Sequence, residues 1–460
     1  MTYQRSKREL RDIILDMMIR INDGGEFCHL VLREVLAQLS QTDSSVTTHE
    51  KALIKRIVNG TLERQLQIDY FIDGIANTPV SKMRSTIANL MRISVYQILF
   101  LDGVPDHAVC DEAVKIAKRR GFSSLSGFVN AVLRTISKEK SQLPYPDEND
   151  DSIKGLSLRF AMPEWIVGKW CAEMPDERVK ILLSALLKEM PLTLRLCANL
   201  NKDEKAAWLR AVNDSGSDIQ PHSILDYVYQ LRKVDDITTL PGYKEGVFAI
   251  QDFGSVLVCE AAGIKEDDVV IDVCAAPGGK SLHAAEKAKL VIARDINKQK
   301  CRLMSENAAR LGRSNLDIVV HDACIFEPSL VNKGDVLFVD LPCSGLGVIA
   351  RKPDIKHKLT LAALADIENL QRQILATVWQ YVKPGGIMIY STCTISKGEN
   401  EEMMDWFTAN FPFTQDSFPS DSPLSYIAKL TDSKVAGECQ LLPGIHESDG
   451  FYIRRLRRMG

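Results

Sequence analysis

Two cysteines stand at equivalent places in the second half of the chain, each shortly after an apolar run. Residues 336–339 lead into Asp340-Leu341-Pro342-Cys343, and residues 386–390 lead into Ser391-Thr392-Cys393. An apolar run that ends in Asp, Pro and small residues indicates a buried strand followed by a loop. Open α/β sheets bind their ligands beyond the carboxyl ends of the strands. We therefore expect both thiols and the Asp340 carboxylate to face one pocket.

A cysteine at such a site could act as a nucleophile. Cysteine attacks as the thiolate, of which only about 3% is present at neutral pH when the pKa is near 8.5. Ser396-Lys397-Gly398-Glu399 has the form of a capping box and predicts a helix that starts immediately after Cys393. The positive end of this helix and Lys397 would favour the Cys393 thiolate. For Cys343, the local sequence is equally consistent with a buried structural thiol.

A second group of residues indicates a cofactor site. Residues 269–274 predict a first strand, a turn of small residues follows, and Asp295 ends the next predicted strand, 23 residues after Asp272. The turn lacks the first glycine of a Walker phosphate loop, because residue 274 is Cys, and the Gly-x-Gly-x-x-Gly fingerprint is also absent. An acid at Asp295 fits a pair of ribose hydroxyls, as in a cofactor with an adenosine half.

Further carboxylates define the charge of this site. Asp322 and Asp340 end two more predicted strands. Each Asp taken alone is also consistent with a helix cap, but with Asp272 and Asp295 they make an anionic rim. Such a rim would repel a pyrophosphate and suit the sulfonium of S-adenosylmethionine. With a nucleophilic thiol, this cofactor indicates methylation of carbon 5 of a pyrimidine, which reacts only after a thiolate has added to carbon 6. The base would have to leave any stack it occupies.

The elements that must position these residues alternate regularly after residue 253. Five predicted strands end at residues 274, 295, 320, 340 and 393, and predicted helices cover residues 281–288, 298–311 and 359–382. This alternation predicts a doubly wound, mostly parallel sheet. Residues 450–453 predict an additional antiparallel strand at its edge. We assign residues 251–460 to this α/β domain, residues 156–250 to a small α+β subdomain, and residues 141–155 to a linker.

Residues 1–140 read as an all-α domain. Apolar residues recur at intervals of three and four over residues 10–21, and similar patterns cover residues 52–66, 84–100, 111–120 and 128–133. The region holds 20 Lys and Arg against 16 Asp and Glu, a mildly basic balance that is compatible with nucleic acid. For Lys118-Arg119-Arg120 a solvated helix end is favoured over an RNA contact.

Composition limits the class of protein. The 460 residues are 45% hydrophobic and 25% charged, as in an ordinary soluble protein. No apolar run approaches the roughly 20 residues that span a bilayer, and the amino terminus lacks a signal-peptide pattern. The 11 cysteines include no Cys-x-x-Cys, so neither a disulfide framework nor a zinc site is expected. We expect a cytoplasmic monomer that binds neither membrane nor metal.

Several of these stretches resemble the signature blocks of the RNA cytosine-C5 methyltransferases, in the family's order and over about residues 155–458. The blocks are Asp272-Val273-Cys274-Ala275-Ala276-Pro277-Gly278-Gly279-Lys280, Asp340-Leu341-Pro342-Cys343-Ser344-Gly345, Arg351-Lys352-Pro353-Asp354-Ile355-Lys356, Ser391-Thr392-Cys393-Thr394 and Asp449-Gly450-Phe451. The helical region, with Glu112-Ala113-Val114 and residues 128–133, is similar to the NusB-type RNA-binding domain. This pairing resembles the bacterial members of the family that modify small-subunit ribosomal RNA.

The resemblance implies a class I (Rossmann-like) methyltransferase fold and assigns roles to residues. Cys393 becomes the nucleophile that attacks carbon 6, Cys343 is associated with product release, and Lys280 and Asp340 orient the cytosine. The residues implied to hold S-adenosylmethionine are Cys274, Ala275, Ala276, Pro277, Gly278, Gly279, Lys280, Asp295, Asp322 and Asp340. The chain departs from the family where Arg195-Leu196-Cys197 replaces Arg-Val-Asn and where His357 replaces an aromatic residue. Both departures are expected on the RNA side of the site.

The function predicted from the sequence is methyl transfer to carbon 5 of a cytosine in 16S rRNA, either naked or in a partly assembled subunit. Within the same class, transfer RNA or 23S rRNA is an alternative substrate. An alternative from another class is a NusB-like RNA-binding or antitermination factor with a silent methyltransferase fold. The presence of both cysteines and of the full set of Asp residues weighs against a silent fold.

Overall fold

The computed structural model describes residues 7–42, 46–197, 200–234, 236–430, 433 and 435–460. Contacts within the chain divide it into two compact units. The first comprises residues 1–188 and 349–358, and the second comprises residues 189–348 and 359–460. The domain boundaries expected from the sequence, at residues 140, 155 and 250, stay predictions.

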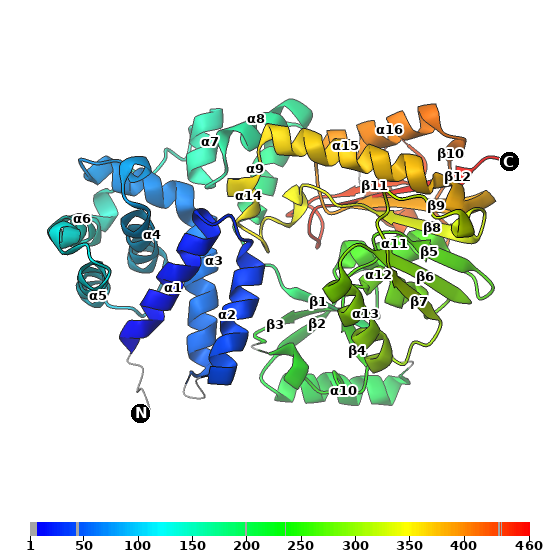
Figure 1. Ribbon diagram of the computed structural model, residues 1–460, viewed down its shortest axis with the longest axis horizontal. Helices are drawn as coiled ribbons and strands as arrows, with labels where there is room; N and C mark the ends of the chain where they lie inside the picture. Colours follow the sequence, from blue (N-terminus) through cyan, green and yellow to red (C-terminus); the bar gives the residue numbers. More distant parts are fainter. Residues whose placement is uncertain (1–6, 43–45, 198–199, 235, 431–432, 434) are drawn as a thin grey trace. The chain divides into compact units, whose positions relative to one another are not determined.

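The first unit is made of helices that enclose an apolar core. The helices are α1 (Lys7–Asn22), α2 (Cys28–Thr42), α3 (Thr48–Ile75), α4 (Ser85–Phe100), α5 (Asp106–Arg119), α6 (Ser126–Lys138), α7 (Ile153–Arg159), α8 (Glu164–Glu173), α9 (Asp176–Ala185) and α14 (Ile355–Lys358) (Figure 1). The apolar spacing explains α1, because Ile14, Met17 and Met18 are buried in this core. A capping box of Thr47 and Glu50 starts α3. The all-α prediction is confirmed, although the sequence patterns did not reveal α2.

The basic cluster at the end of α5 is paired with acids of α1. Arg120 Nε lies 3.0 Å from Asp12 Oδ1, and Arg120 Nη1 lies 2.8 Å from Asp16 Oδ1. Arg119 also pairs with Asp12. These cations therefore join two helices, and the choice between a solvated helix end and an RNA contact stays a prediction.

The segment 349–358 leaves the second unit in sequence but packs within the first. Lys356 Nζ donates a hydrogen bond to Glu63 O at 2.7 Å, and His357 Nε2 bonds to Leu62 O at 2.7 Å. Burial lowers the pKa of His357 to about 3, so the ring is neutral and its Nε2–H donates to the carbonyl. This bond is to a carbonyl of α3, and the expectation that His357 lies on the RNA side stays a prediction.

The second unit begins with a small antiparallel sheet of order β2-β3-β1-β4. Its strands are β1 (Leu192–Leu196), β2 (Asp218–Pro221), β3 (Val228–Arg232) and β4 (Phe248–Ile250), and α10 (Lys202–Asp214) accompanies them. Leu194, Trp208, Tyr229 and Phe248 form the core between this sheet and α10. Arg195 is buried and bonds to Glu286 Oε2 at 2.7 Å, a residue 91 positions away. The expectation that residues 195–197 lie on the RNA side stays a prediction.

The larger sheet has the order β10-β12-β9-β8-β5-β6-β7. Its strands are β5 (Val269–Asp272), β6 (Leu290–Asp295), β7 (Leu316–Val320), β8 (Gly334–Asp340), β9 (Val382–Thr392), β10 (Phe413–Gln415), β11 (Glu438–Leu441) and β12 (Phe451–Arg458). The strands from β7 to β9 pair in parallel, and β12 is antiparallel to β9. The expectation of an edge strand near residue 451 is wrong, since β12 lies between β9 and β10 and also pairs with β11. Residues 451–456 are all buried, which an edge position would not allow.

Helices cover both faces of the larger sheet (Figure 1). They are α11 (Phe253–Ala262), α12 (Gly279–Ala284), α13 (Lys298–Arg310), α15 (Leu361–Val378), α16 (Glu401–Asn410) and α17 (Leu424–Leu430), with short 3-10 helices at Leu346–Val348 and Lys397–Glu399. Because side chains alternate along a strand, Val270 packs toward α11 and the next residue, Ile271, packs toward α15. Among the described residues, no helix combines the length and apolarity that a membrane span requires.

Candidate active site

The turn after β5 brings backbone N–H groups to the carboxyl end of the parallel sheet. Ala275 N donates to Arg294 O at 2.8 Å, and Ala276 N donates to Asp295 Oδ2 at 3.0 Å. Gly278 has a φ of 108°, and a Cβ at this position would lie 2.7 Å from Met304 Cγ. Only glycine meets both demands, and α12 can therefore start at Gly279 directly after the turn.

The acids of the rim differ in their surroundings. Asp272 is buried and accepts a hydrogen bond from Ser281 Oγ at 2.6 Å, and burial raises its pKa to about 7. It therefore supports the first turn of α12. Asp295 and Asp322 are more accessible, and each accepts a bond from the backbone N–H two residues on, at 2.8 and 2.9 Å. Their oxygens retain lone pairs that could accept further bonds.

Cys274 lies among these acids. Burial and then the charges of Asp272 and Asp340 hold the pKa of its thiol well above the ordinary value. Cys274 is therefore a neutral wall of the site. The three carboxylates that raise this pKa, those of Asp272, Asp340 and Asp295, give the region a negative potential.

Lys280 and Asp340 form an ion pair between α12 and the end of β8. Lys280 Nζ lies 2.6 Å from Asp340 Oδ2 and 5.5 Å from the centre of the Phe451 ring. Burial lowers the pKa of Lys280, but the charge of Asp340 outweighs this effect and raises the pKa overall, so the ammonium stays charged. Asp340 also accepts a bond from Ser391 Oγ at 2.7 Å, which joins the ends of β8 and β9.

The structure brings the two thiols into contact. Cys343 Sγ and Cys393 Sγ are 3.2 Å apart, and both residues are half-buried. The hydrogen bond with Cys393, and then burial, hold the pKa of the Cys343 thiol well above its ordinary value. The two sulfurs are within hydrogen-bond distance, and either thiol could be the donor.

A buried carboxylate holds the loop that carries Cys343. Glu399 accepts hydrogen bonds from Ser344 N at 2.8 Å, Ser344 Oγ at 2.5 Å and Gln371 Nε2 at 3.1 Å. The predicted capping box is wrong, because Glu399 bonds to this loop and the Ser396 side chain caps nothing. The α-helix begins only at Glu401, so its amino terminus does not follow Cys393 immediately. Sequence reasoning missed the role of Glu399, whose partner Ser344 is 55 residues away.

Two glycines press the same loop against Cys393. Gly347 N donates to Cys393 O at 3.2 Å, and Gly450 N donates to Gly347 O at 2.9 Å. A Cβ on Gly347 would lie 2.1 Å from Gly450 O, so a larger residue would push the backbones apart. Gly347 and Gly450 thus let the start of β12 secure the geometry of both thiols.

Solved structures share the architecture of this chain. The crystal structure of the protein PH0851 superposes with a TM-score of 0.79 at 21% identity and covers 100% of both chains. The structure of NSun6 from Pyrococcus horikoshii with SFG has a TM-score of 0.56 at 19% identity and covers 65% of this chain and 98% of its own. With the sheet order, this likeness shows the predicted fold, a doubly wound and mostly parallel sheet of the Rossmann-like type.

Sequence comparisons identify the family. The family model of 16S rRNA methyltransferase RsmB/F matches residues 261–457, and the NusB family model matches residues 8–138. A Bacillus subtilis protein described as "probable ribosomal RNA small subunit methyltransferase B" is 32% identical over 99% of this chain and 100% of its own length. The ribosomal RNA small subunit methyltransferase B of Cronobacter sakazakii is 27% identical over 97% of this chain and 98% of its own.

The chain belongs to the ribosomal RNA small subunit methyltransferase B family. It is therefore an S-adenosylmethionine-dependent methyltransferase with a NusB-type domain at its amino terminus. The predictions of family, fold class and cofactor are confirmed.

Proposed function

We propose that this chain methylates carbon 5 of a cytosine in 16S rRNA through a covalent bond between Cys393 and carbon 6 of the base. The observation that carries the proposal is the contact between Cys343 and Cys393, 3.2 Å apart at the ends of adjacent strands. The printed name of the Bacillus subtilis relative supports small-subunit ribosomal RNA as the substrate. Transfer RNA and 23S rRNA are the alternatives that the experiment below must separate.

S-adenosylmethionine supplies an electrophilic methyl group on a sulfonium when it is bound. We assign its site to the turn from Cys274 to Lys280 and to the carboxylates of Asp295, Asp322 and Asp340. The negative potential of these acids suits a cationic ligand. Asp295 would bind the ribose hydroxyls, as an acid at the end of the second strand does in related sheets. The next residue, Ile296, is 68% exposed and offers an apolar surface to the adenine ring.

The thiols divide the covalent chemistry between them. Carbon 5 of cytosine becomes nucleophilic when the Cys393 thiolate adds to carbon 6. After methylation, carbon 5 gives its proton to water, the C5–H electron pair forms the C5–C6 double bond, and the C6–S bond breaks to release the Cys393 thiolate and restore the aromatic ring. A hydrogen bond from the protonated Cys343 stabilises charge on Cys393 Sγ, both before attack and as the thiolate leaves. The 3.2 Å contact between the two sulfurs supports this role.

Asp340 and Lys280 would orient the base. Cytosine presents an amino group as a hydrogen-bond donor where uracil presents a carbonyl oxygen, and carboxylates accept from this amino group. The charged Lys280 holds the Asp340 carboxylate in place through their 2.6 Å contact. This arrangement favours cytosine over uracil.

The decisive experiment incubates the purified chain with labelled S-adenosylmethionine and separate 16S, 23S and transfer RNA, and then locates the product by bisulfite sequencing. We expect 5-methylcytosine in 16S rRNA. Cys393→Ala should lower transfer by more than about 1,000-fold with cofactor affinity unchanged. Cys343→Ala should accumulate a protein–RNA adduct that survives denaturant, because the leaving thiolate has lost its hydrogen-bond donor.

Cys171→Ala is the matched control, since Cys171 is another half-buried thiol but lies in the first unit. Its transfer should equal that of the unchanged chain. Full turnover by Cys393→Ala would refute the covalent mechanism. Methylation confined to 23S or transfer RNA would refute the assigned substrate.

A further inference from the structure

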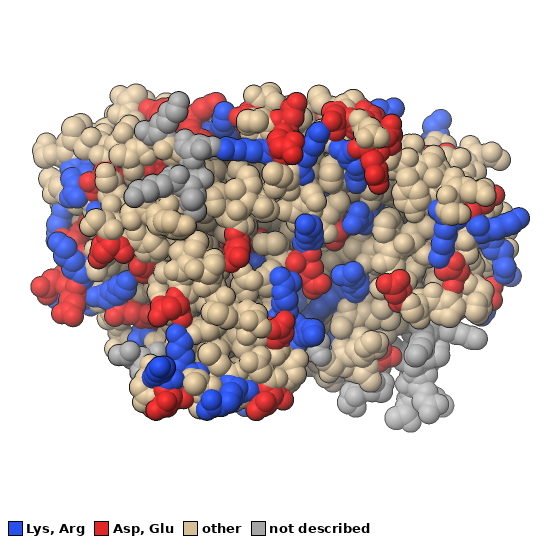
Figure 2. Space-filling model, turned by 180° about the vertical axis from the view of Figure 1, so that it is seen from behind, with Lys and Arg blue, Asp and Glu red and all other residues tan. Residues whose placement is uncertain are grey.

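Several arginines of the helical unit form ion pairs with nearby carboxylates. Arg92 makes two bonds of 2.7 Å to Asp69, and Arg20 binds Glu26 and Glu34. On the described surface shown in Figure 2, Lys and Arg side chains are interspersed with Asp and Glu, without a broad field of one sign.

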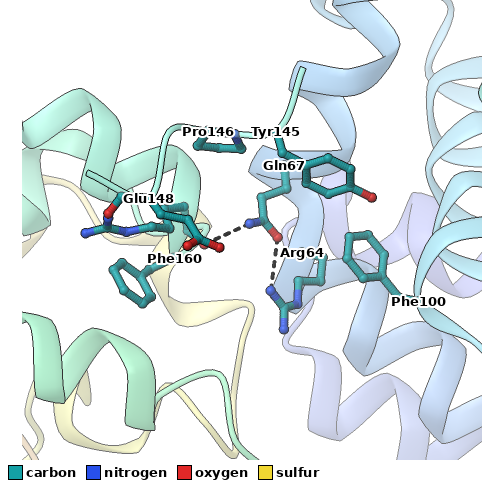
Figure 3. A pocket seen from close by; sticks show the side chains of 8 residues that line it. Arg64, Gln67, Phe100, Tyr145, Pro146, Glu148 and Phe160 are labelled. Atoms are coloured by element: carbon teal, nitrogen blue, oxygen red, sulfur yellow. Dashed lines mark hydrogen bonds between the residues drawn. The ribbon is translucent and has the colours of Figure 1, made fainter. Parts of the chain in front are cut away.

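A cavity of about 530 Å³ lies within the first unit (Figure 3). Helices α3 and α4, the segment that follows residue 144 and the end of α7 contribute to it. Its lining consists of Arg64, Gln67, Phe100, Tyr145, Pro146, Glu148, Arg159 and Phe160. This volume lies in the range of small-ligand sites and far exceeds that of a packing defect.

Each of the two arginines in the cavity rests on an aromatic ring. Arg64 Cζ lies 5.3 Å from the centre of Phe100, and Arg159 Cζ lies 4.9 Å from the centre of Phe160. Figure 3 shows Phe100 and Phe160 on opposite sides of the cavity, with Gln67 between them. The cavity thus has flat cationic and aromatic surfaces on both sides.

Polar groups lie between these flat surfaces. Gln67 is buried, accepts a bond from Arg64 Nη1 at 3.1 Å and donates to Arg159 O at 2.8 Å. The Glu148 side chain is exposed and has no hydrogen bond to another described residue. Tyr145 is 52% exposed, although its ring contacts Phe71 at 4.9 Å between centres. An exposed aromatic face and a free carboxylate are therefore available to a ligand.

We propose that this cavity binds an unpaired base of the RNA substrate. Proteins recognise single-stranded RNA by stacking bases on aromatic rings and guanidinium planes and by bonding to their edges, which are the groups present here. Arg64 Nε lies 3.5 Å from Glu63 Oε1 and Arg159 Nη2 lies 3.3 Å from Asp151 Oδ1, so both guanidinium groups stay charged while their planes can stack on a base. The inference rests on the proposed function only in naming the substrate RNA as the source of the base.

The test measures binding of a fluorescent single-stranded RNA of about 10 nucleotides, and of the same strand in a duplex, by anisotropy. Tyr145→Ala should weaken binding of the single strand by about 5- to 100-fold, the range for one lost stacked base. Tyr145→Phe keeps the ring and should bind as the unchanged chain does. Because stacking involves no phosphate, Tyr145→Ala should also leave the salt dependence of binding unchanged.

Arg64→Gln should weaken the same binding, whereas Arg134→Gln is the control, because Arg134 is an exposed arginine of the same unit that does not line the cavity. Unchanged affinity in Tyr145→Ala, or equal losses in Tyr145→Ala and Tyr145→Phe, would overturn the proposal. The proposal would also be overturned if an aromatic-rich peptide bound more tightly than RNA and if Tyr145→Ala weakened binding of the peptide alone.

The proposed function can fail separately from this inference. If the unchanged chain transfers no methyl group to 16S rRNA but Tyr145→Ala still loses RNA affinity, the base site stands and the assigned reaction does not. If 16S rRNA is methylated with equal KM by the unchanged chain and by Tyr145→Ala, the base site is refuted and the reaction stands.

Discussion

Glu399 offers the sharpest test of how the structure positions the thiols. Its side chain is buried and accepts three hydrogen bonds, two of them from Ser344, the residue after Cys343. Burial raises the pKa of Glu399, and the bonds from Ser344 oppose this effect. Replacement by Gln keeps the shape of the side chain but exchanges one acceptor oxygen for an NH2 donor.

The expected losses of stability and of reaction rate follow from these contacts. Hydrogen bonds to charged groups contribute roughly 1.5–3 kcal/mol each, and a buried donor left unpaired costs about 1–3 kcal/mol. Glu399→Gln can keep one of the bonds from Ser344 and should therefore lower the free energy of unfolding by about 2–4 kcal/mol. A shift of the loop by about 1 Å lowers the rate of a positioned reaction by roughly 100-fold. We expect a loss of that order in the methyl-transfer step.

The assay is single-turnover methyl transfer to 16S rRNA, with cofactor affinity by calorimetry and thermal unfolding measured in parallel. If Glu399 positions the loop, Glu399→Gln should slow the methyl-transfer step and leave cofactor affinity nearly unchanged. In the Glu399→Gln background, the further loss of rate caused by Cys343→Ala should be smaller than in the unchanged chain. Glu402→Gln is the control, because Glu402 lies three residues further on and is exposed. Unchanged single-turnover rate and unfolding temperature in Glu399→Gln would refute the reasoning.

Two further predictions concern pH. Burial raises the pKa of Asp272 from 3.8 to about 7 in the folded chain. The free energy of unfolding should therefore fall as pH rises from about 4 to 7, by at most about 4 kcal/mol. Denaturant unfolding should show a smaller fall in Asp272→Asn and the same fall in Asp267→Asn, a control at an exposed residue. Burial lowers the pKa of Lys356 from 10.5 to about 7, so stability should rise between pH 7 and about 10. Lys356→Met should flatten that rise, and an equal rise in the variant would contradict the burial of this amine.

Local patterns in the sequence were enough to predict the α/β domain. The strands β5, β6, β8 and β9 follow from short apolar runs that end in polar or small residues, because such runs must be buried on both faces of a parallel sheet. The turn from Cys274 to Gly279 follows from its small residues, of which Gly278 alone adopts a positive φ. These features depend on neighbours in the chain, and the sequence displays them directly.

Contacts between distant residues were decided only by the tertiary structure. The capping box at Ser396 did not form, since Glu399 meets the donors of Ser344 from 55 residues away. The strand at Phe451 became an inner strand because β10 and β11 both pair with it.

The pairing register also determined the distance between the thiols. Asp340 faces Ser391 across β8 and β9, which sets Cys343 Sγ 3.2 Å from Cys393 Sγ. The sequence by itself determined which groups are present at the strand ends and that they share one edge of the sheet. Only the folded chain determined which of them touch, because register and loop packing depend on contacts that no local pattern encodes.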